Sequence, residues 1–182
     1  MRRTIAFVLM ITLLLLSGCG ARAGETAVKN FQQSLAAAQG VSFTAKMRAE
    51  YPDKTENYTL DFSRSGTTST VEVREPKLIA GIKAHMEDGS SSLEYDGAAL
   101  DTGVLEGGLT PVGALPALES AMAGGHLDLV WKEGELTAAQ ITPRDQLTVT
   151  VWFDGGMNPC RAELQSSGKV VVYCDIINFT YK

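Results

Sequence analysis

The chain has three cysteines, Cys19, Cys160 and Cys174, whose thiols could form disulfides or other covalent bonds. The Ser-Ser-Gly sequence at 166–168 is typical of a β-hairpin turn, and a hairpin centred on residue 167 places Cys160 opposite Cys174. Directly opposed residues of antiparallel strands have Cα atoms about 4.5–5.5 Å apart, which is within disulfide reach. We therefore expect a Cys160–Cys174 disulfide, and the alternative is a pair of free core thiols.

Two histidines, His85 and His126, are the candidates for a general base or an imidazole metal ligand. Neither belongs to a recognisable nucleophile motif, and the chain has no glycine-rich phosphate loop. His85 has the polar parity of a strand and His126 begins one, so we expect both at the surface. The sequence thus predicts no catalytic residue, no metal site and no cofactor, which indicates a protein that is not an enzyme.

The third cysteine, Cys19, follows an N-terminal leader. Arg2 and Arg3 precede an uncharged apolar segment, residues 4–16, which is shorter than the roughly 20 residues that span a bilayer. The segment ends in Leu-Ser-Gly-Cys at 16–19, which resembles the lipobox of bacterial lipoproteins. This resemblance implies lipid attachment at Cys19, and the alternative is an ordinary signal peptide in which the cysteine is incidental.

The lipobox divides the chain into a signal peptide at 1–18, a lipidated cysteine with a short tether at 19–24, and one domain at 25–182. Two or more acyl chains, such as palmitate, anchor a protein stably, whereas a single chain binds only marginally. We expect the protein in the bacterial cell envelope, anchored on the outer side of the cytoplasmic membrane, or in the outer membrane of a Gram-negative cell.

Composition excludes one large class of partner. The formal net charge is −5, and 45% of the 182 residues are hydrophobic. An acidic chain without a basic cluster lacks the electrostatic footprint of nucleic-acid binding, so we expect no nucleic-acid partner. The apolar content is sufficient for the core of one globular domain.

The hydrophobic pattern predicts one helix followed by many strands. Apolar residues at Val28, Phe31, Leu35 and Ala38 have helical spacing within residues 25–39. Beyond Gly40 the period changes to two, which is typical of strands with one buried face. The expected strands lie at 41–51, 58–63, 71–73, 78–86, 93–95, 127–131, 136–141, 147–153, 160–164 and 170–176.

Residues 109–125 interrupt the strands with apolar residues at helical spacing and with prolines at 111 and 116. We expect one or two short helices there, acting either as a mobile lid or as an ordinary packing helix. The two tryptophans differ in parity: we expect Trp131 to face the core and Trp152 to lie outside.

Three short motifs accompany this order of elements: Glu-Pro-Lys-Leu-Ile-Ala-Gly at 75–81, Leu-Glu-Tyr-Asp-Gly at 93–97, and Asn-Pro at 158–159 before the last hairpin. With the lipobox and the helical insertion, they resemble the LolA/LolB-like superfamily of outer-membrane lipoprotein-sorting proteins over nearly all of residues 25–182. The resemblance implies an α+β fold: a strongly curved antiparallel half-barrel whose concave face is covered by the N-terminal helix and the insertion.

The apolar concave face of such a sheet needs a cover, which an acyl chain or a helix supplies. The resemblance implies a membrane-anchored, carrier-like protein that binds lipid or lipoprotein acyl chains. The alternative is a non-enzymatic adaptor that supports a protein partner in the cell envelope, such as a cell-wall or spore-germination enzyme. The candidate cavity-lining residues are Phe43, Met47, Leu60, Phe62, Val71, Val73, Ile82, Met86, Leu115, Leu118 and Met122.

Overall fold

The computed structural model describes residues 19–87, 90–95, 98–103, 110–144 and 147–182. They form an α+β fold with a single sheet and two α-helices. The helices are α2 (Cys19–Ala37) and α3 (Pro111–Gly124), with a 3₁₀ turn η1 (Lys77–Ile79). The strands are β1 (Gly40–Glu50), β2 (Thr55–Ser65), β3 (Thr68–Glu75), β4 (Lys83–Glu87), β5 (Ser90–Tyr95), β6 (Ala98–Gly103), β7 (His126–Glu133), β8 (Leu136–Arg144), β9 (Leu147–Phe153), β10 (Pro159–Ser166) and β11 (Lys169–Tyr181).

The strands pair antiparallel in the order β6-β5-β4-β3-β2-β1-β11-β10-β9-β8-β7. The chain enters at the centre of the sheet with β1, meanders outward to β6, and resumes at the opposite edge with β7 before returning to β11. Among the described strands, β1 and β11 are the one pair of neighbours that do not follow each other in the sequence. Their pairing joins the two meanders into one sheet.

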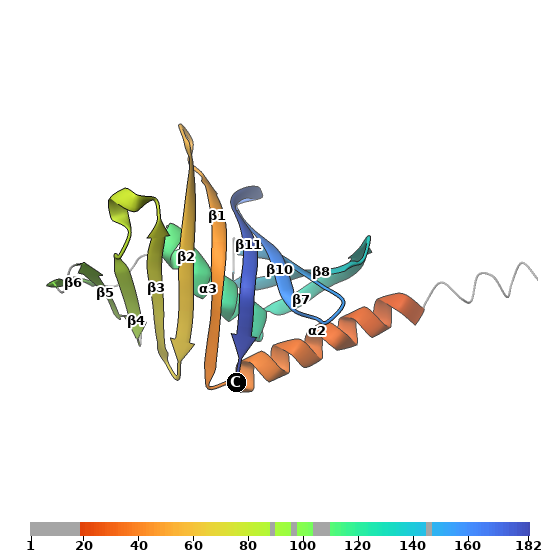
Figure 1. Ribbon diagram of the computed structural model, residues 1–182. Coiled ribbons are helices and arrows are strands. Elements are labelled where there is room, and N and C mark those ends of the chain that lie inside the picture. The colour runs from red at the N-terminus through yellow and green to blue at the C-terminus, as the bar shows by residue number, and fades with distance from the viewer. Residues whose placement is uncertain (1–18, 88–89, 96–97, 104–109, 145–146) are drawn as a thin grey trace, which may run out of the picture.

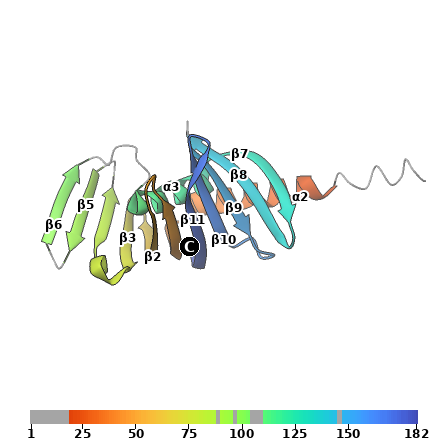
Figure 2. The same cartoon turned by 90° about the horizontal axis from the view of Figure 1, so that it is seen from above.

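Both helices lie on one face of this sheet (Figure 1). Helix α3 links the two meanders behind the central strands and contacts β2 and β3 on one side and β8, β9 and β10 on the other. Helix α2 contacts α3 and the edge strand β7, and the view from above shows the strands curving around the two helices (Figure 2). The expected α+β architecture, with two helices covering the concave face, is confirmed.

The apolar stripe predicted for the first helix is also confirmed. Val28, Phe31, Leu35 and Ala38 are at most 8% exposed and belong to the core. The described helix begins at Cys19, however, so the residues expected to form a tether (19–24) are helical. No helix of the described residues is long and apolar enough to cross a membrane, and the predicted signal peptide lies outside the described residues.

The strand predicted at 78–86 is shorter than expected. Its first part forms the turn η1 after a cis peptide bond between Glu75 and Pro76, and β4 begins only at Lys83. Because residues 77–79 turn instead of extending, Leu78 does not share the inward parity of the strand and is 89% exposed.

The last hairpin has a different register from the predicted one, and the predicted disulfide is not formed. Its turn contains two residues with positive φ, Ser167 and Gly168, so it is centred half a residue further along, and a bulge in β11 adds another shift. Ala162, not Cys160, therefore lies opposite Cys174. Both cysteines are free thiols.

A bulge in β7 overturns the prediction for Trp131. The register shifts between Leu127 and Leu129, which adds one residue to the strand and reverses its alternation. Leu127 packs against the core, whereas Leu129 is 56% exposed and Trp131 lies on the outer face beside Trp152. The outward position predicted for Trp152 is confirmed.

Candidate functional site

The predicted cavity residues do come together on the concave face, where those of α3 pack against those of the strands and fill the space before the sheet. Those contributed by β1, β2, β3 and α3 are at most 3% exposed: Phe43, Met47, Leu60, Phe62, Val71, Val73, Leu115, Leu118 and Met122. Ile82 and Met86 are half-buried and pack against the same cluster. These residues form a continuous apolar surface, and their role as a ligand cavity remains a prediction.

Helix α3 is apolar on almost every side. Its buried residues are Ala114, Leu115, Leu118, Glu119, Ala121 and Met122. Thr110 caps its start by accepting a hydrogen bond from the Gly113 N–H at 3.1 Å, and Gln32 of α2 donates to the Gly125 carbonyl at 3.0 Å just beyond its end. A helix that is hydrophobic all round needs burial on all sides, which explains its place between the sheet and α2.

One polar contact of α3 is buried among these apolar residues. Glu119 accepts a hydrogen bond from Nε of Arg64, at the end of β2, with 2.9 Å between the atoms. The same guanidinium donates to the carbonyls of Leu35 and Ala38 at the C-terminus of α2, at 3.3 and 3.1 Å. A cation at a helix C-terminus is favourable because the last carbonyls lack helical partners. Arg64 therefore joins β2, α2 and α3.

The outer face of the sheet has a different character. A row of directly paired residues crosses it from β3 to β7: Glu75, Thr59, Lys46, Asp175, Arg161, Trp152, Ala138 and Trp131. A second row, two residues further along the strands, contains Asn57, Arg48, Tyr173 and Glu163. The two rows bring charged residues of four strands side by side.

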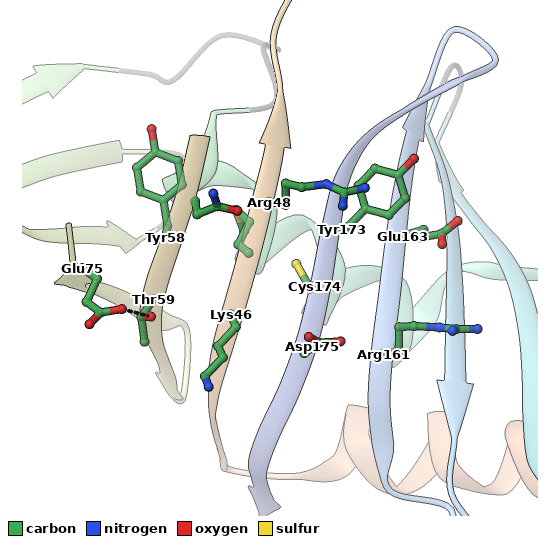
Figure 3. Close-up of a pocket in the computed structure, with 12 residues that line it drawn as sticks. Lys46, Arg48, Tyr58, Thr59, Glu75, Arg161, Glu163, Tyr173, Cys174 and Asp175 are labelled. Atoms are coloured by element: carbon green, nitrogen blue, oxygen red, sulfur yellow. Dashed lines mark hydrogen bonds between the residues drawn. The ribbon is translucent and has the colours of Figure 1, made fainter. Parts of the chain in front are cut away.

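A pocket of about 610 Å³ lies between these rows and is lined by residues of β3, β2, β1, β11 and β10 (Figure 3). Its charged lining is balanced: Lys46, Arg48 and Arg161 are basic, and Glu75, Glu163 and Asp175 are acidic. We call it the outer pocket. Sequence analysis missed it, because the only sequence signal is the polar parity of each strand, and pairing β1 with β11 requires the tertiary structure.

A cluster of three interacting side chains, Arg161, Trp152 and Glu133, borders the outer pocket. The guanidinium of Arg161 lies 3.9 Å from the centroid of the Trp152 ring, and its Nη2 lies 2.9 Å from Glu133 Oε1. The Trp152 N–H donates to the other oxygen of Glu133 at 2.8 Å. This hydrogen bond, and then the one from Arg161, lowers the pKa of Glu133 below its ordinary value.

Comparison with known proteins identifies the fold. No protein-family model and no curated protein sequence matches the chain. Among solved structures, a LolA superfamily protein from Nitrosomonas europaea matches with a TM-score of 0.51 at 11% identity, covering 87% of this chain and 93% of that one. The chain has a LolA-like fold.

Two further structures match this LolA-like fold. An uncharacterized conserved protein from Thermus thermophilus has a TM-score of 0.51 at 8% identity, with 87% of each chain covered. A chain in the structure of the Clostridioides difficile CwlD amidase with the GerS lipoprotein has a TM-score of 0.47 at 16% identity, covering 87% of this chain and 95% of that one.

The two histidines of the LolA-like domain lie at the surface, as expected. His85 Nδ1 and Thr70 Oγ1 are 3.0 Å apart, and His85 Nε2 is 3.1 Å from Glu94 Oε2. The side chain of His126 is 82% exposed. Within the described ranges, no group of three or more His, Cys, Asp or Glu residues could hold a metal ion.

The cysteines of the LolA-like domain are poor nucleophiles. Burial first, and then the nearby Asp175 carboxylate, raises the pKa of Cys174 to about 12. Burial also raises the pKa of Cys160, whose Sγ lies 3.3 Å from the Trp152 carbonyl oxygen. Because the thiolate is the reactive form, neither residue is suited to redox or nucleophilic chemistry.

Proposed function

We propose that this protein is a membrane-anchored extracytoplasmic lipoprotein that binds lipid or lipoprotein acyl chains on the concave face of its LolA-like sheet. An acyl chain would take the place that α3 occupies in this structure. Acylation of Cys19 would supply the membrane anchor, and no enzymatic activity or cofactor is part of the proposal.

The observation that carries the proposal is the continuous apolar surface under α3. Burying Leu115, Leu118 and Met122 contributes about 1.5–3 kcal/mol for each side chain. An acyl chain contributes about 0.8 kcal/mol for each buried methylene group. A chain of about ten methylene groups therefore replaces the burial that these three side chains lose when α3 moves away.

The attachment of α3 is compatible with such an exchange. In the described part of the chain its only ion pair to the sheet is that between Glu119 and Arg64. A buried ion pair adds little net stability, because desolvation of the two charges offsets their attraction. Two consecutive glycines, Gly124 and Gly125, follow the last buried turn and give the backbone freedom to redirect the helix.

The position of α2 supports action close to the membrane. A Cβ on Gly24 would lie 3.2 Å from Val130 Cγ1 and 3.7 Å from Thr137 Cγ2, so the helix lies directly against β7 and β8 at this residue. Five residues of helix, about 7.5 Å at 1.5 Å each, separate this contact from Cys19. An acylated Cys19 would hold the sheet edge near the bilayer.

Native mass spectrometry tests the proposal. The chain from residue 20 onward is exported behind a cleavable signal, purified gently, and analysed before and after organic extraction and after addition of palmitic acid. We expect a co-purifying lipid or acylated peptide, or a one-to-one complex with palmitic acid. A folded protein that stays empty, even with palmitic acid or a triacylated peptide, contradicts the proposal.

Two adjacent residues of β4 provide a matched pair for this test. Met86 packs against the concave cluster, whereas His85 lies on the outer face. Met86→Gln places a polar amide where the acyl chain would bind, so we expect weaker palmitic acid binding. His85→Gln is the control and should bind as the unchanged protein does.

A second candidate function is the non-enzymatic adaptor, which is favoured by the filling of the concave face by α2 and α3 in this structure. In that case the helices serve as a permanent core, and the outer surfaces bind a protein partner in the cell envelope. Crosslinking at the cell surface tests it: recovery of one specific partner, together with an empty concave face, would support the adaptor over the carrier.

A further inference from the structure

The outer pocket lies on the face of the sheet opposite to the proposed acyl site, and its charges are of two kinds. Some are already paired: Arg48 lies 3.0 Å from Glu50, and Arg161 lies 2.9 Å from Glu133. Lys46, Asp175 and Glu163 have no ion pair and no side-chain hydrogen bond to any described residue. Glu75, the remaining charged residue of the lining, accepts a hydrogen bond from Thr59 Oγ1 at 2.8 Å. Among the groups without such a partner, the pocket presents one ammonium group and two carboxylates to a ligand.

This charge pattern indicates a ligand that carries both signs. Lys46 and Asp175 face each other across β1 and β11, and Glu163 lies on β10 in the neighbouring row. A purely anionic ligand would meet two unpaired carboxylates, and a purely cationic one would meet Lys46. Complementary charges give specificity because each wrong pairing costs free energy.

The aromatic residues beside the pocket argue against a neutral glycan. Sugars stack on open aromatic faces, but the Arg48 guanidinium lies 4.2 Å from the centroid of the Tyr173 ring and the Arg161 guanidinium 3.9 Å from that of Trp152. Trp152 is only 5% exposed. Both rings therefore already have a cation–π contact. Tyr58, the other aromatic residue of the lining, packs against the hydrophobic core.

The dimensions of the outer pocket suit a short extended peptide. Its lining covers five neighbouring strands, β3, β2, β1, β11 and β10, which is about 19 Å at a strand spacing of about 4.8 Å. Lys46 and Glu163 are two strands and one row apart, which places their Cα atoms about 12 Å from each other. Four extended residues, at about 3.3 Å each, cover about 13 Å.

We propose that the outer pocket binds a short, extended peptide with a free carboxylate and a free ammonium group. Lys46 receives the carboxylate, and Asp175 and Glu163 receive the ammonium group. The side chains labelled in Figure 3 come from five neighbouring strands, β3, β2, β1, β11 and β10, and the pairing of these strands sets the spacing of the charged residues. The site is independent of the concave face.

Isothermal titration calorimetry with tetra-alanine tests this site. The full chain is purified in a non-ionic detergent and titrated at low salt, where charge contacts are least screened. The probes are tetra-alanine with free termini, its C-terminal amide, its N-acetyl form and the doubly blocked form. We expect binding of the free peptide and at least a tenfold loss when either terminus is blocked.

Variants assign each terminus to its partner. Lys46→Met should weaken binding of the free peptide at least tenfold relative to the unchanged protein. The C-terminal amide, which lacks the carboxylate, should bind the Lys46→Met protein as weakly as it binds the unchanged protein. Asp175→Asn combined with Glu163→Gln should also weaken binding of the free peptide at least tenfold. This double variant should bind the N-acetyl peptide, which lacks the ammonium group, as weakly as the unchanged protein does. Lys169→Met, an exposed lysine of β11 outside the pocket, is the matched control and should bind normally.

Three results would overturn the proposal: no binding of the free peptide at millimolar concentration, equal binding of the doubly blocked peptide, or equal effects of Lys46→Met and Lys169→Met. A fourth result, tighter binding of chitotetraose than of the free peptide, would also overturn it and would replace the peptide with a glycan. These results are separate from the acyl-binding test, because Met86→Gln should leave peptide binding unchanged and Lys46→Met should leave palmitic acid binding unchanged.

Discussion

Arg64 Nε lies 2.9 Å from Glu119 Oε1, and this contact joins the end of β2 to the helix that fills the concave face. The two side chains are only 16% and 8% exposed. Arg64 also donates to the last carbonyls of α2. One guanidinium therefore holds both helices against the sheet, in a core that is otherwise apolar.

Removing Arg64 should be costly. Arg64→Ala removes the hydrogen-bond donor of the buried Glu119 carboxylate and the donor to the Ala38 carbonyl, and breaking a buried pair from one side costs about 3–5 kcal/mol. We expect a loss of that size in the free energy of unfolding, measured with urea. Arg74→Ala, which breaks the more exposed pairs with Asp61 and Glu72, is the control and should cost about 1 kcal/mol or less. Equal losses would mean that Arg64 has no special role.

Two adjacent glycines should respond in opposite ways. A Cβ on Gly125 would lie 2.4 Å from Ile141 Cγ2 and 2.9 Å from the Ala121 carbonyl oxygen, whereas a Cβ on Gly124 meets nothing within 4 Å. We expect Gly125→Ala to destabilise the protein by about 1–3 kcal/mol through overpacking. Gly124→Ala, at the last position of α3, should stabilise it by about 0.5–1 kcal/mol. The free energy of unfolding of both variants is measured with urea. A Gly125→Ala protein as stable as the unchanged protein would contradict the close packing at this residue.

The thiols of Cys160 and Cys174 should be free and slow to react. Because burial raises the pKa of both thiols, the thiolate fraction near neutral pH is small and labelling with iodoacetamide should accelerate as the pH rises. We expect Cys160, which is partly exposed, to react before Cys174. Mass spectrometry of the unfolded, unreduced protein should show both residues labelled. If labelling required prior reduction, the result would contradict the free thiols and support the disulfide predicted from the sequence.

The outer cluster around Trp152 should titrate in acid. The pKa of Glu133 is lowered by hydrogen bonds from Trp152 and Arg161, so its carboxylate favours the folded state above the ordinary pKa of 4.5. This contribution is lost as the pH falls through the lower, folded pKa. Tryptophan fluorescence should change with a midpoint below 4.5 as the Trp152 hydrogen bond loses its ionised acceptor. Glu133→Gln should abolish the transition, and Glu135→Gln should keep it.

The local periodicity of the sequence determined the kind and order of most elements. The stripe Val28–Phe31–Leu35 predicted α2, and the alternation beyond Gly40 predicted β1, because each pattern depends only on neighbours a few residues away. The concave residues could be named for the same reason: in β1 and β2, parity alone separates Phe43 and Phe62 from their polar neighbours. The cover of these residues by the insertion was also predicted, through the family resemblance.

Only the tertiary structure decided which residues meet on the outer face and across the last hairpin. A single bulge in β7 moved Trp131 outward, and a turn with two positive-φ residues placed Ala162 opposite Cys174. The outer pocket depends on the pairing of Lys46 with Asp175, which are far apart in the chain. The physical reasons differ. In β7 one inserted residue reverses the side-chain alternation, and in the last hairpin the turn and the bulge set the register. Pairing between the distant strands β1 and β11 is settled by the packing of the whole sheet.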